Sequence, residues 1–193
     1  MNQKNHSFDF SRYFQNIALT LKDVAPIPPS GGTKGGFHRV SGIAHLEEFL
    51  HNLTRPADNG YHLVIEDNLD SRFIYNSATL LDEQYYVFYV LKRCKLNDFD
   101  AIEQAKEGCK SVAKKIWSKI FRDHKSDNMP VRAVGSTPSF GGGQGGGCLR
   151  DFRKNSITNQ TIGPIADQYW GLMCSFTIAD NPGIKYNEND WFE

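Results

Sequence analysis

The chain has 193 residues, which is enough for one domain with a hydrophobic core and tight for two. Aromatic residues make up 12% of the sequence, which excludes a typical disordered chain, because disorder goes with few aromatic side chains and high net charge. Lys+Arg and Asp+Glu both total 22, so the zero net charge argues against a general nucleic-acid or membrane-surface binder.

The N-terminal part predicts one helix followed by an arm. Apolar residues at helical spacing predict an amphipathic helix over residues 8–24, with Ser7 as its N-cap. The prolines and glycines of residues 26–40 end this helix and predict an extended, mobile connection. We therefore assign residues 1–40 as an N-terminal helix and a Pro/Gly-rich arm.

Residues 41–180 are predicted to form the α+β body. Ser41 is a candidate N-cap for a short helix, and a strand is predicted over residues 61–67. Residues 68–82 have little periodicity and are interpreted as a polar excursion. Residues 83–93 give the clearest strand, and because both of its faces are apolar, we expect it to be central and covered on both sides.

The second half of the body predicts the longest helix and the last strand. A continuous apolar stripe predicts a helix over residues 100–124. A short strand is a candidate at residues 129–135, and the glycines at 141–147 predict a flexible loop. Strict alternation predicts a strand over residues 168–180, and residues 181–193 form a turn-rich tail. The predicted fold is α+β, a mainly antiparallel sheet backed by a long amphipathic helix.

The glycine-rich segments and the histidines give no motif for a cofactor. GGTKGG at residues 31–36 lacks the order of a phosphate-binding loop, and GGGQGGG at 141–147 lacks the strand and helix that flank a dinucleotide site. The histidines at positions 38, 45 and 51 are interpreted as solvated surface residues. We therefore expect no cofactor and no metal.

The four cysteines are widely spaced and form no C-x-x-C pair, so free thiols are expected. Cys109 lies on the apolar stripe of the long helix and is interpreted as a core residue. Cys94 lies beside Arg93 and Lys95, an environment that can lower its pKa, but the sequence specifies no partnering base. Solvation at strand ends and turns explains a further set of acidic residues, Glu66, Asp67, Asp70, Asp82 and Glu83. We expect no catalytic residues and no enzymatic activity.

The best candidate for nucleic-acid binding is a basic face on the long helix. Lys115, Lys119 and Arg122 share this face. A solvated helix face is the favoured interpretation, so nucleic acid is not an expected partner, and a nucleic-acid-binding module stays the alternative function. No segment approaches the ~18 uninterrupted apolar residues of a membrane span, and the first ten residues lack the apolar region of a signal peptide. We therefore expect a soluble protein with no membrane partner.

Three segments together resemble a known class of proteins: LDEQYYVFYVLKR, DFDAIEQAKEGCKSVAKKIWSKIFRDH and GPIADQYWGLMCSFTI. They resemble small structural proteins at the head–tail junction or tail end of tailed bacteriophages and prophages, nearest to the tail-terminator and tail-completion class. The resemblance covers roughly residues 61–180. It implies an α+β subunit of a homo-oligomeric ring, often sixfold, that caps the tail tube and joins it to the neck connector within the virion. It implies no catalytic residues.

The C-terminal tail ends in Trp191 and Phe192, which would be unfavourable exposed groups on a lone monomer. Glycine-rich segments and aromatic termini suit arms that become ordered on a partner surface. The candidate interaction residues are Lys115, Lys119, Arg122, Trp191 and Phe192.

Overall fold

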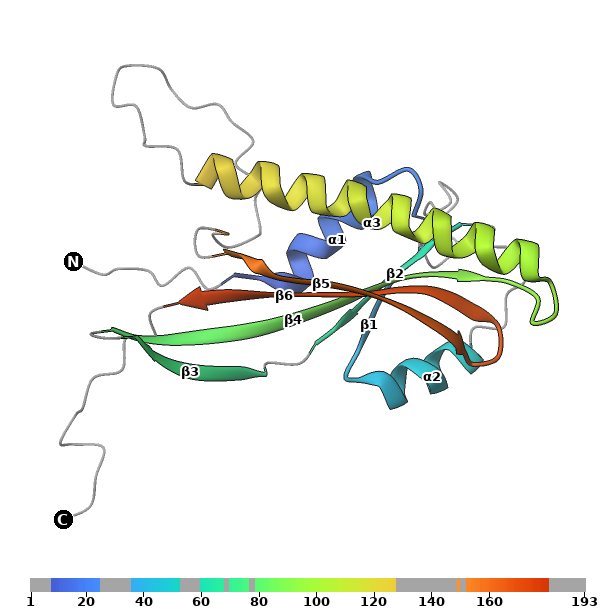
Figure 1. The fold of residues 1–193 in the computed structure, drawn as a ribbon, viewed down its shortest axis with the longest axis horizontal. Helices are drawn as coiled ribbons and strands as arrows, with labels where there is room; N and C mark the ends of the chain where they lie inside the picture. Colours follow the sequence, from blue (N-terminus) through green and yellow to red (C-terminus); the bar gives the residue numbers. More distant parts are fainter. Residues whose placement is uncertain are drawn as a thin grey trace, which may run out of the picture.

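A computed structural model describes residues 8–24, 36–52, 60–67, 70–76, 79–127, 149 and 152–180. These residues form three helices and one six-stranded sheet that is mostly antiparallel, and a long helix packs against the sheet (Figure 1). The predicted α+β class is therefore confirmed.

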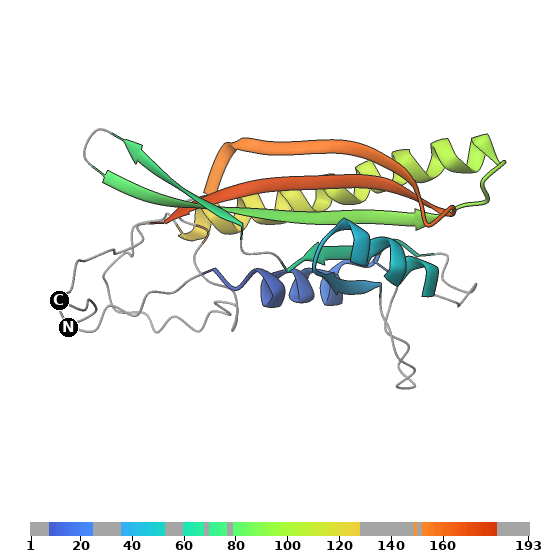
Figure 2. The same cartoon turned by 90° about the horizontal axis from the view of Figure 1, so that it is seen from below.

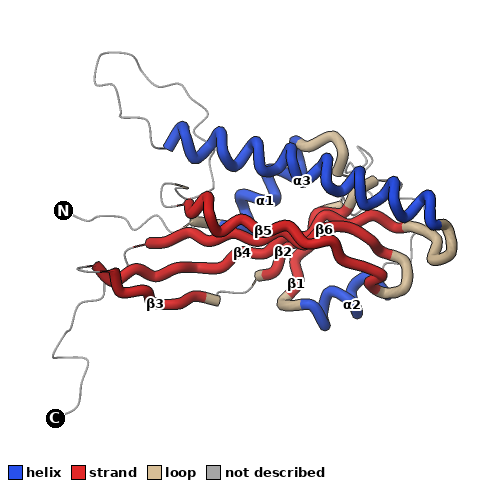
Figure 3. Tube along the Cα trace, viewed as in Figure 1, coloured by secondary structure: helices blue, strands red, loops and turns tan. Residues whose placement is uncertain are grey.

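The strands follow the order β1-β2-β4-β6-β5, and β3 pairs with β4 as well (Figure 3). Their bounds are β1 Phe37–Val40, β2 His62–Glu66, β3 Ser71–Asn76, β4 Thr79–Arg93, β5 Phe152–Ile165 and β6 Tyr169–Asp180. β1 is parallel to β2, and the other pairs are antiparallel. β3 pairs with residues 79–84 of β4, and β2 pairs with residues 88–91 of β4. Both strands therefore lie along one edge of β4, and β6 pairs with the other edge.

The helices cover the two faces of the sheet unequally (Figure 2). Their bounds are α1 Phe10–Thr20, α2 Ile43–Asn52 and α3 Phe99–Asp127. α1 and α3 pack on one face, where the larger core contains Phe14, Phe88 and Phe176. α2 packs on the opposite face near β1 and β2, in a smaller core with Leu46 and Leu91. β4 is thus central and covered on both faces, as its apolar pattern predicts.

Aromatic side chains fill the larger core. The ring centroid of Phe14 on α1 lies 4.9 Å from that of Phe88 on β4. Trp117 on α3 lies 5.2 Å from Phe88 and 5.8 Å from Phe176 on β6. Large rings of this kind bury much apolar area, so they hold both helices against the sheet.

Glycine is required where β4 and β6 meet. A Cβ atom added to Gly171 would lie 1.9 Å from the backbone carbonyl oxygen of Val90. Because that atom belongs to the backbone of the neighbouring strand, the two strands can approach as they do only without a side chain at this position.

The start of α1 differs from the prediction in one respect. The Oδ1 atom of Asp9 accepts a hydrogen bond from the backbone amide of Arg12 at 2.9 Å, so Asp9 is the N-cap. The predicted cap, Ser7, lies outside the described residues. α1 packs within the main core through Phe10, Tyr13, Phe14 and Ile17.

Two segments that the sequence analysis interpreted as connections contain strands. Residues 37–40 form β1, although residues 26–40 are interpreted as a mobile connection. Residues 71–76 form β3 within the supposed polar excursion, and β4 begins at Thr79. β5 is a third strand that the sequence analysis did not predict. The candidate strand at 129–135, the glycines at 141–147 and the tail lie outside the described residues.

Candidate functional site

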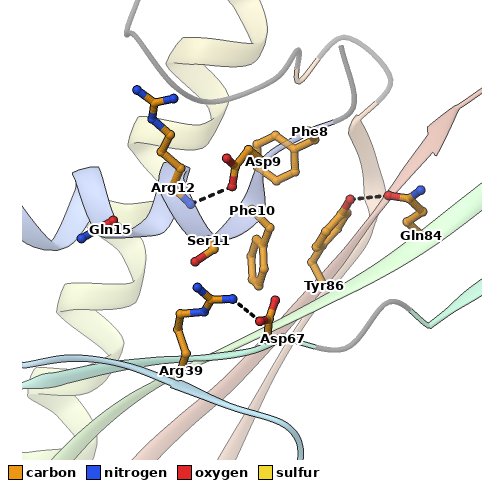
Figure 4. Close-up of a pocket in the computed structure, with 10 residues that line it drawn as sticks. All are labelled: Phe8, Asp9, Phe10, Ser11, Arg12, Gln15, Arg39, Asp67, Gln84 and Tyr86. Carbon is orange, nitrogen blue, oxygen red and sulfur yellow. Dashed lines mark hydrogen bonds and ion pairs between the residues drawn. The ribbon is translucent and has the colours of Figure 1, made fainter. Parts of the chain in front are cut away.

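A polar recess of about 680 Å³ lies between the first turn of α1 and the sheet (Figure 4). Arg39 on β1 and Asp67 after β2 point toward one another across its floor and form an ion pair. The hydroxyl of Tyr86 donates to Oε1 of Gln84 at 2.5 Å on the β4 side. The described lining residues include serine and tyrosine hydroxyls but neither histidine, cysteine nor lysine. Of the described carboxylates that line the recess, Asp9 accepts from the amide of Arg12 and Asp67 is paired with Arg39.

Two histidines form a buried pair on the opposite face of the sheet. The Nε2 atom of His38 lies 3.2 Å from Nδ1 of His62. The ring of Phe49 packs against His38, with 4.7 Å between the two ring centroids. The interpretation of His38 as a solvated residue is therefore wrong, because its position on β1 turns the ring inward beside Val40. His45 and His51 are exposed, as expected.

The three cysteines that the structure describes, Cys94, Cys109 and Cys174, are free thiols with raised pKa values. Burial raises the pKa values of Cys109 and Cys174 to about 12, and Cys109 is a core residue as predicted. Burial also raises the pKa of Cys94. The charge of Lys92 lowers this pKa, and the charge of Asp98 raises it further. The expected lowering of the Cys94 pKa is therefore wrong, because burial outweighs the charges near it in the sequence. Within the described ranges, no group of three His, Cys, Asp or Glu residues is placed to hold a metal ion.

One of the acidic residues that flank the first strands has a structural role. Glu83 is buried and accepts a hydrogen bond from Nε of Arg72 at 2.9 Å. This hydrogen bond raises the pKa of the Arg72 guanidinium. The hydroxyl of Thr177 lies 3.4 Å from the other carboxylate oxygen. Solvation at a strand end therefore does not explain Glu83, whereas Asp70 is exposed as that interpretation requires.

The predicted basic face of α3 is present, but its charges are paired. Lys115 Nζ donates to both carboxylate oxygens of Asp23 at 2.8 Å. Lys119 forms an ion pair with Asp123, and Arg122 Nε lies 3.5 Å from the same carboxylate. Intramolecular carboxylates therefore compete with any phosphate for these cations. Two further candidate interaction residues, Trp191 and Phe192, lie outside the described residues.

The most distinctive exposed feature is the β3–β4 hairpin, which extends past the C-terminal end of α3 (Figure 1). On β3, the side chains of Phe73 and Tyr75 are 60% and 74% exposed. They are two residues apart and so lie on the same face of the strand. The sequence does not predict this feature, because residues 68–82 show little periodicity and the strand conformation of β3 depends on its ladder with β4.

The sheet also ends in an unusual edge strand. Along residues 155–165, β5 contains no charged side chain, and most of its side chains are exposed. Among the strands that the structure describes, only β6 pairs with β5, and only β4 pairs with β3. The candidate functional site is therefore a surface made of strand edges, which suits binding to another protein chain.

Comparison of the chain with protein-family models, curated proteins and solved structures finds no match. No helix in the described part of the chain is long and apolar enough to cross a membrane.

Proposed function

We propose that this chain is a structural subunit of a phage or phage-like particle, in the class of tail-terminator and neck proteins. In this role it forms a homo-oligomeric ring in the virion, joins the tail tube to the head connector and catalyses no reaction. The resemblance of the strand 83–93, the long helix and the strand 168–180 to that class supports the particle assignment.

The observation that carries the assembly role is that the outer edges of β3 and β5 have no partner among the described strands. Edge strands of monomeric proteins are normally protected by charges, prolines or short length, because exposed backbone groups pair with other chains. The exposed rings of Phe73 and Tyr75 add apolar area that association would remove from water. Residues 155–165 of β5 have no charged side chain and only Pro164 near their end, which suits an edge that a neighbouring subunit covers.

The charge distribution supports assembly over the alternative of a nucleic-acid-binding module. The net charge is zero, and the cations of Lys115 and Lys119 are held by carboxylates. A protein that binds nucleic acid gains most of its affinity from cations that contact phosphates. Here those contacts would first require two intramolecular ion pairs to open.

The test is microscopy and mass measurement of the purified full chain. We expect closed rings of one size in negative stain, with a matching discrete mass in mass photometry. Added to polymerised tail-tube protein from the same particle, the rings should cap tube ends. A protein that stays monomeric and leaves the tube ends uncapped would contradict the proposal.

A further inference from the structure

The outer edge of β5 has the features of a strand that pairs with another chain. Within the described residues its backbone groups on this edge have no strand partner. Residues 158–162 keep one continuous register with β6, so the edge is regular over this stretch. Residues 155–165 lack the charges that natural proteins place on free edges, whereas Arg153 and Lys154 lie at the start of the strand and Pro164 near its end.

A complementary edge lies on the other side of the sheet. Figure 3 shows β3 and β5 on opposite sides, separated by β4 and β6. β2 lies on the same edge of β4 as β3, but its ladder is with residues 88–91 and leaves β3 uncovered. β3 therefore has a second edge with no described strand on it.

The strand directions make the two edges compatible. β3 is antiparallel to β4, β4 to β6, and β6 to β5. Strand direction therefore alternates across the sheet, and β3 and β5 run in opposite directions. If a second copy is placed beside the first in the same orientation, its β3 runs antiparallel to the β5 of the first. The alternation then continues across the boundary between the two copies.

The side chains also fall on matching faces. Phe73 pairs in register with Asp82, so its side chain is on the face that α1 and α3 cover. On that face of β5, Asn159 accepts a hydrogen bond from Nε1 of Trp117 at 2.9 Å. The flank of α3 beside this contact contains a groove of about 600 Å³ that includes Trp117 and Phe121. In a continued sheet, the exposed rings on β3 of one copy would approach this flank of its neighbour.

Charges favour the same contact. The hairpin contributes Asp70, which is exposed, and Asp82, whose buried Oδ1 atom has no hydrogen-bond partner within the described residues. The α3 groove is bordered by Lys114 and Lys125, both exposed, and neither forms an ion pair with another described residue. Asp82 shares the register position of Phe73 and so lies on the face of the sheet that α3 covers, where a continued sheet would bring its carboxylate toward the lysines of a neighbour's groove.

We infer that copies of this chain associate head to tail, with the β5 edge of one copy pairing antiparallel to the β3 edge of the next. This inference rests on the proposed assembly function and specifies its interface. The two surfaces in contact are different, so each subunit has one of each to offer, and repetition of the contact closes a ring when the rotation between subunits allows it.

The test uses two edge variants with the same change of net charge. Gln160→Lys/Thr161→Lys places charges on the β5 edge, at exposed positions. Phe73→Lys/Tyr75→Lys removes the exposed rings from β3. Glu47→Gln/Glu48→Gln on the exposed side of α2 is the control with matched charge. Circular dichroism and thermal unfolding establish that each variant is folded, and mass photometry gives the assembly state.

We expect the control to form the wild-type oligomer and each edge variant alone to be monomeric. An equimolar mixture of the two edge variants should form heterodimers and nothing larger, because each retains the edge that the other lacks. As a second measurement, Tyr75→Cys and Thr161→Cys chains, mixed before assembly, should form disulfides between the two kinds of chain.

The other outcomes separate this interface from the proposed function. If both folded edge variants still form the wild-type oligomer, the chain assembles through another surface and the inference is overturned. If the β3 variant alone forms dimers, β5 pairs with itself and the head-to-tail arrangement is wrong. A wild-type chain that is monomeric contradicts the assembly function itself.

Discussion

The thiol of Cys94 lies 3.6 Å from the backbone carbonyl oxygen of Ala101, in a partly buried position at the end of β4. Burial raises its pKa more than the ammonium group of Lys92 lowers it. A raised pKa means that less thiolate is present at neutral pH, and the thiolate is the form that reacts with alkylating agents. Cys94 is therefore less reactive than a solvated cysteine.

This predicts the pH profile of Cys94 alkylation. In a Cys148→Ser background, iodoacetamide should modify Cys94 with a midpoint at higher pH than a cysteine in a short peptide shows, measured by mass spectrometry. Cys109 and Cys174 should stay unmodified in the folded protein, because both are buried and have pKa values of about 12. A midpoint below that of the peptide would show that the nearby cations dominate.

At the scale of elements, α1 is held by aromatic contacts more than by its own helical tendency. It has 11 residues, and isolated helices shorter than about 12–15 residues are marginal in water. Phe14 is fully buried, and its ring lies 4.7 Å from Phe10 and 4.9 Å from Phe88. These contacts fix α1 to the sheet and so place the polar recess and Asp23, the partner of Lys115.

Truncation of this ring tests that account. Phe14→Ala should lower the free energy of unfolding by about 3–5 kcal/mol, because it removes a buried ring and leaves a cavity. Hydrogen exchange of the α1 amides should increase more than that of β4. Leu19→Ala on the same helix is the control, since Leu19 is 59% exposed, and it should change stability by less than about 0.5 kcal/mol. Equal effects of the two substitutions would contradict a helix held by its buried face.

The elements that could be predicted from the sequence are those that bury their own side chains in a regular pattern. α3 shows this through its apolar stripe, and β4 and β6 through strands whose buried residues are mostly apolar. β5 has mostly polar, exposed residues, so its strand conformation depends on the ladder with β6 and leaves no local pattern. β1 has four residues and gains its place from parallel pairing with β2, a partner more than twenty residues away.

In the candidate site, too, features set by local spacing can be predicted from the sequence, and features set by distant neighbours cannot. The basic residues of α3 follow from helical spacing, but their neutralisation by Asp23 depends on how α1 ends relative to α3. The burial of His38 depends on β2 and α2 lying beside it. An unpaired strand edge is a property of the whole sheet, because it depends on which strands are neighbours.

At the scale of the whole molecule, the net charge is zero, and two of the three candidate basic residues of α3 are paired with nearby carboxylates. Lys115 is paired with Asp23, which follows α1 in the chain. Lys119 is paired with Asp123, which lies one turn further along α3. Opposite charges that lie this close leave little positive potential around Lys115 and Lys119 to attract a polyanion. The wild-type chain should therefore bind neither duplex nor single-stranded oligonucleotides measurably at low ionic strength, as judged by fluorescence anisotropy.

The matched variant is Asp23→Asn/Asp123→Asn, which keeps the size of both side chains and removes the carboxylates that pair with Lys115 and Lys119. We expect this variant to gain weak binding that falls steeply as salt is added, because each phosphate contact releases counterions. Asp123 also accepts a hydrogen bond from the Tyr13 hydroxyl at 2.8 Å, so thermal unfolding must establish that α1 stays packed. Salt-dependent binding by the wild-type chain, weakened by Lys115→Ala, would instead favour the nucleic-acid-binding function, since the ion pairs would then open readily for phosphate.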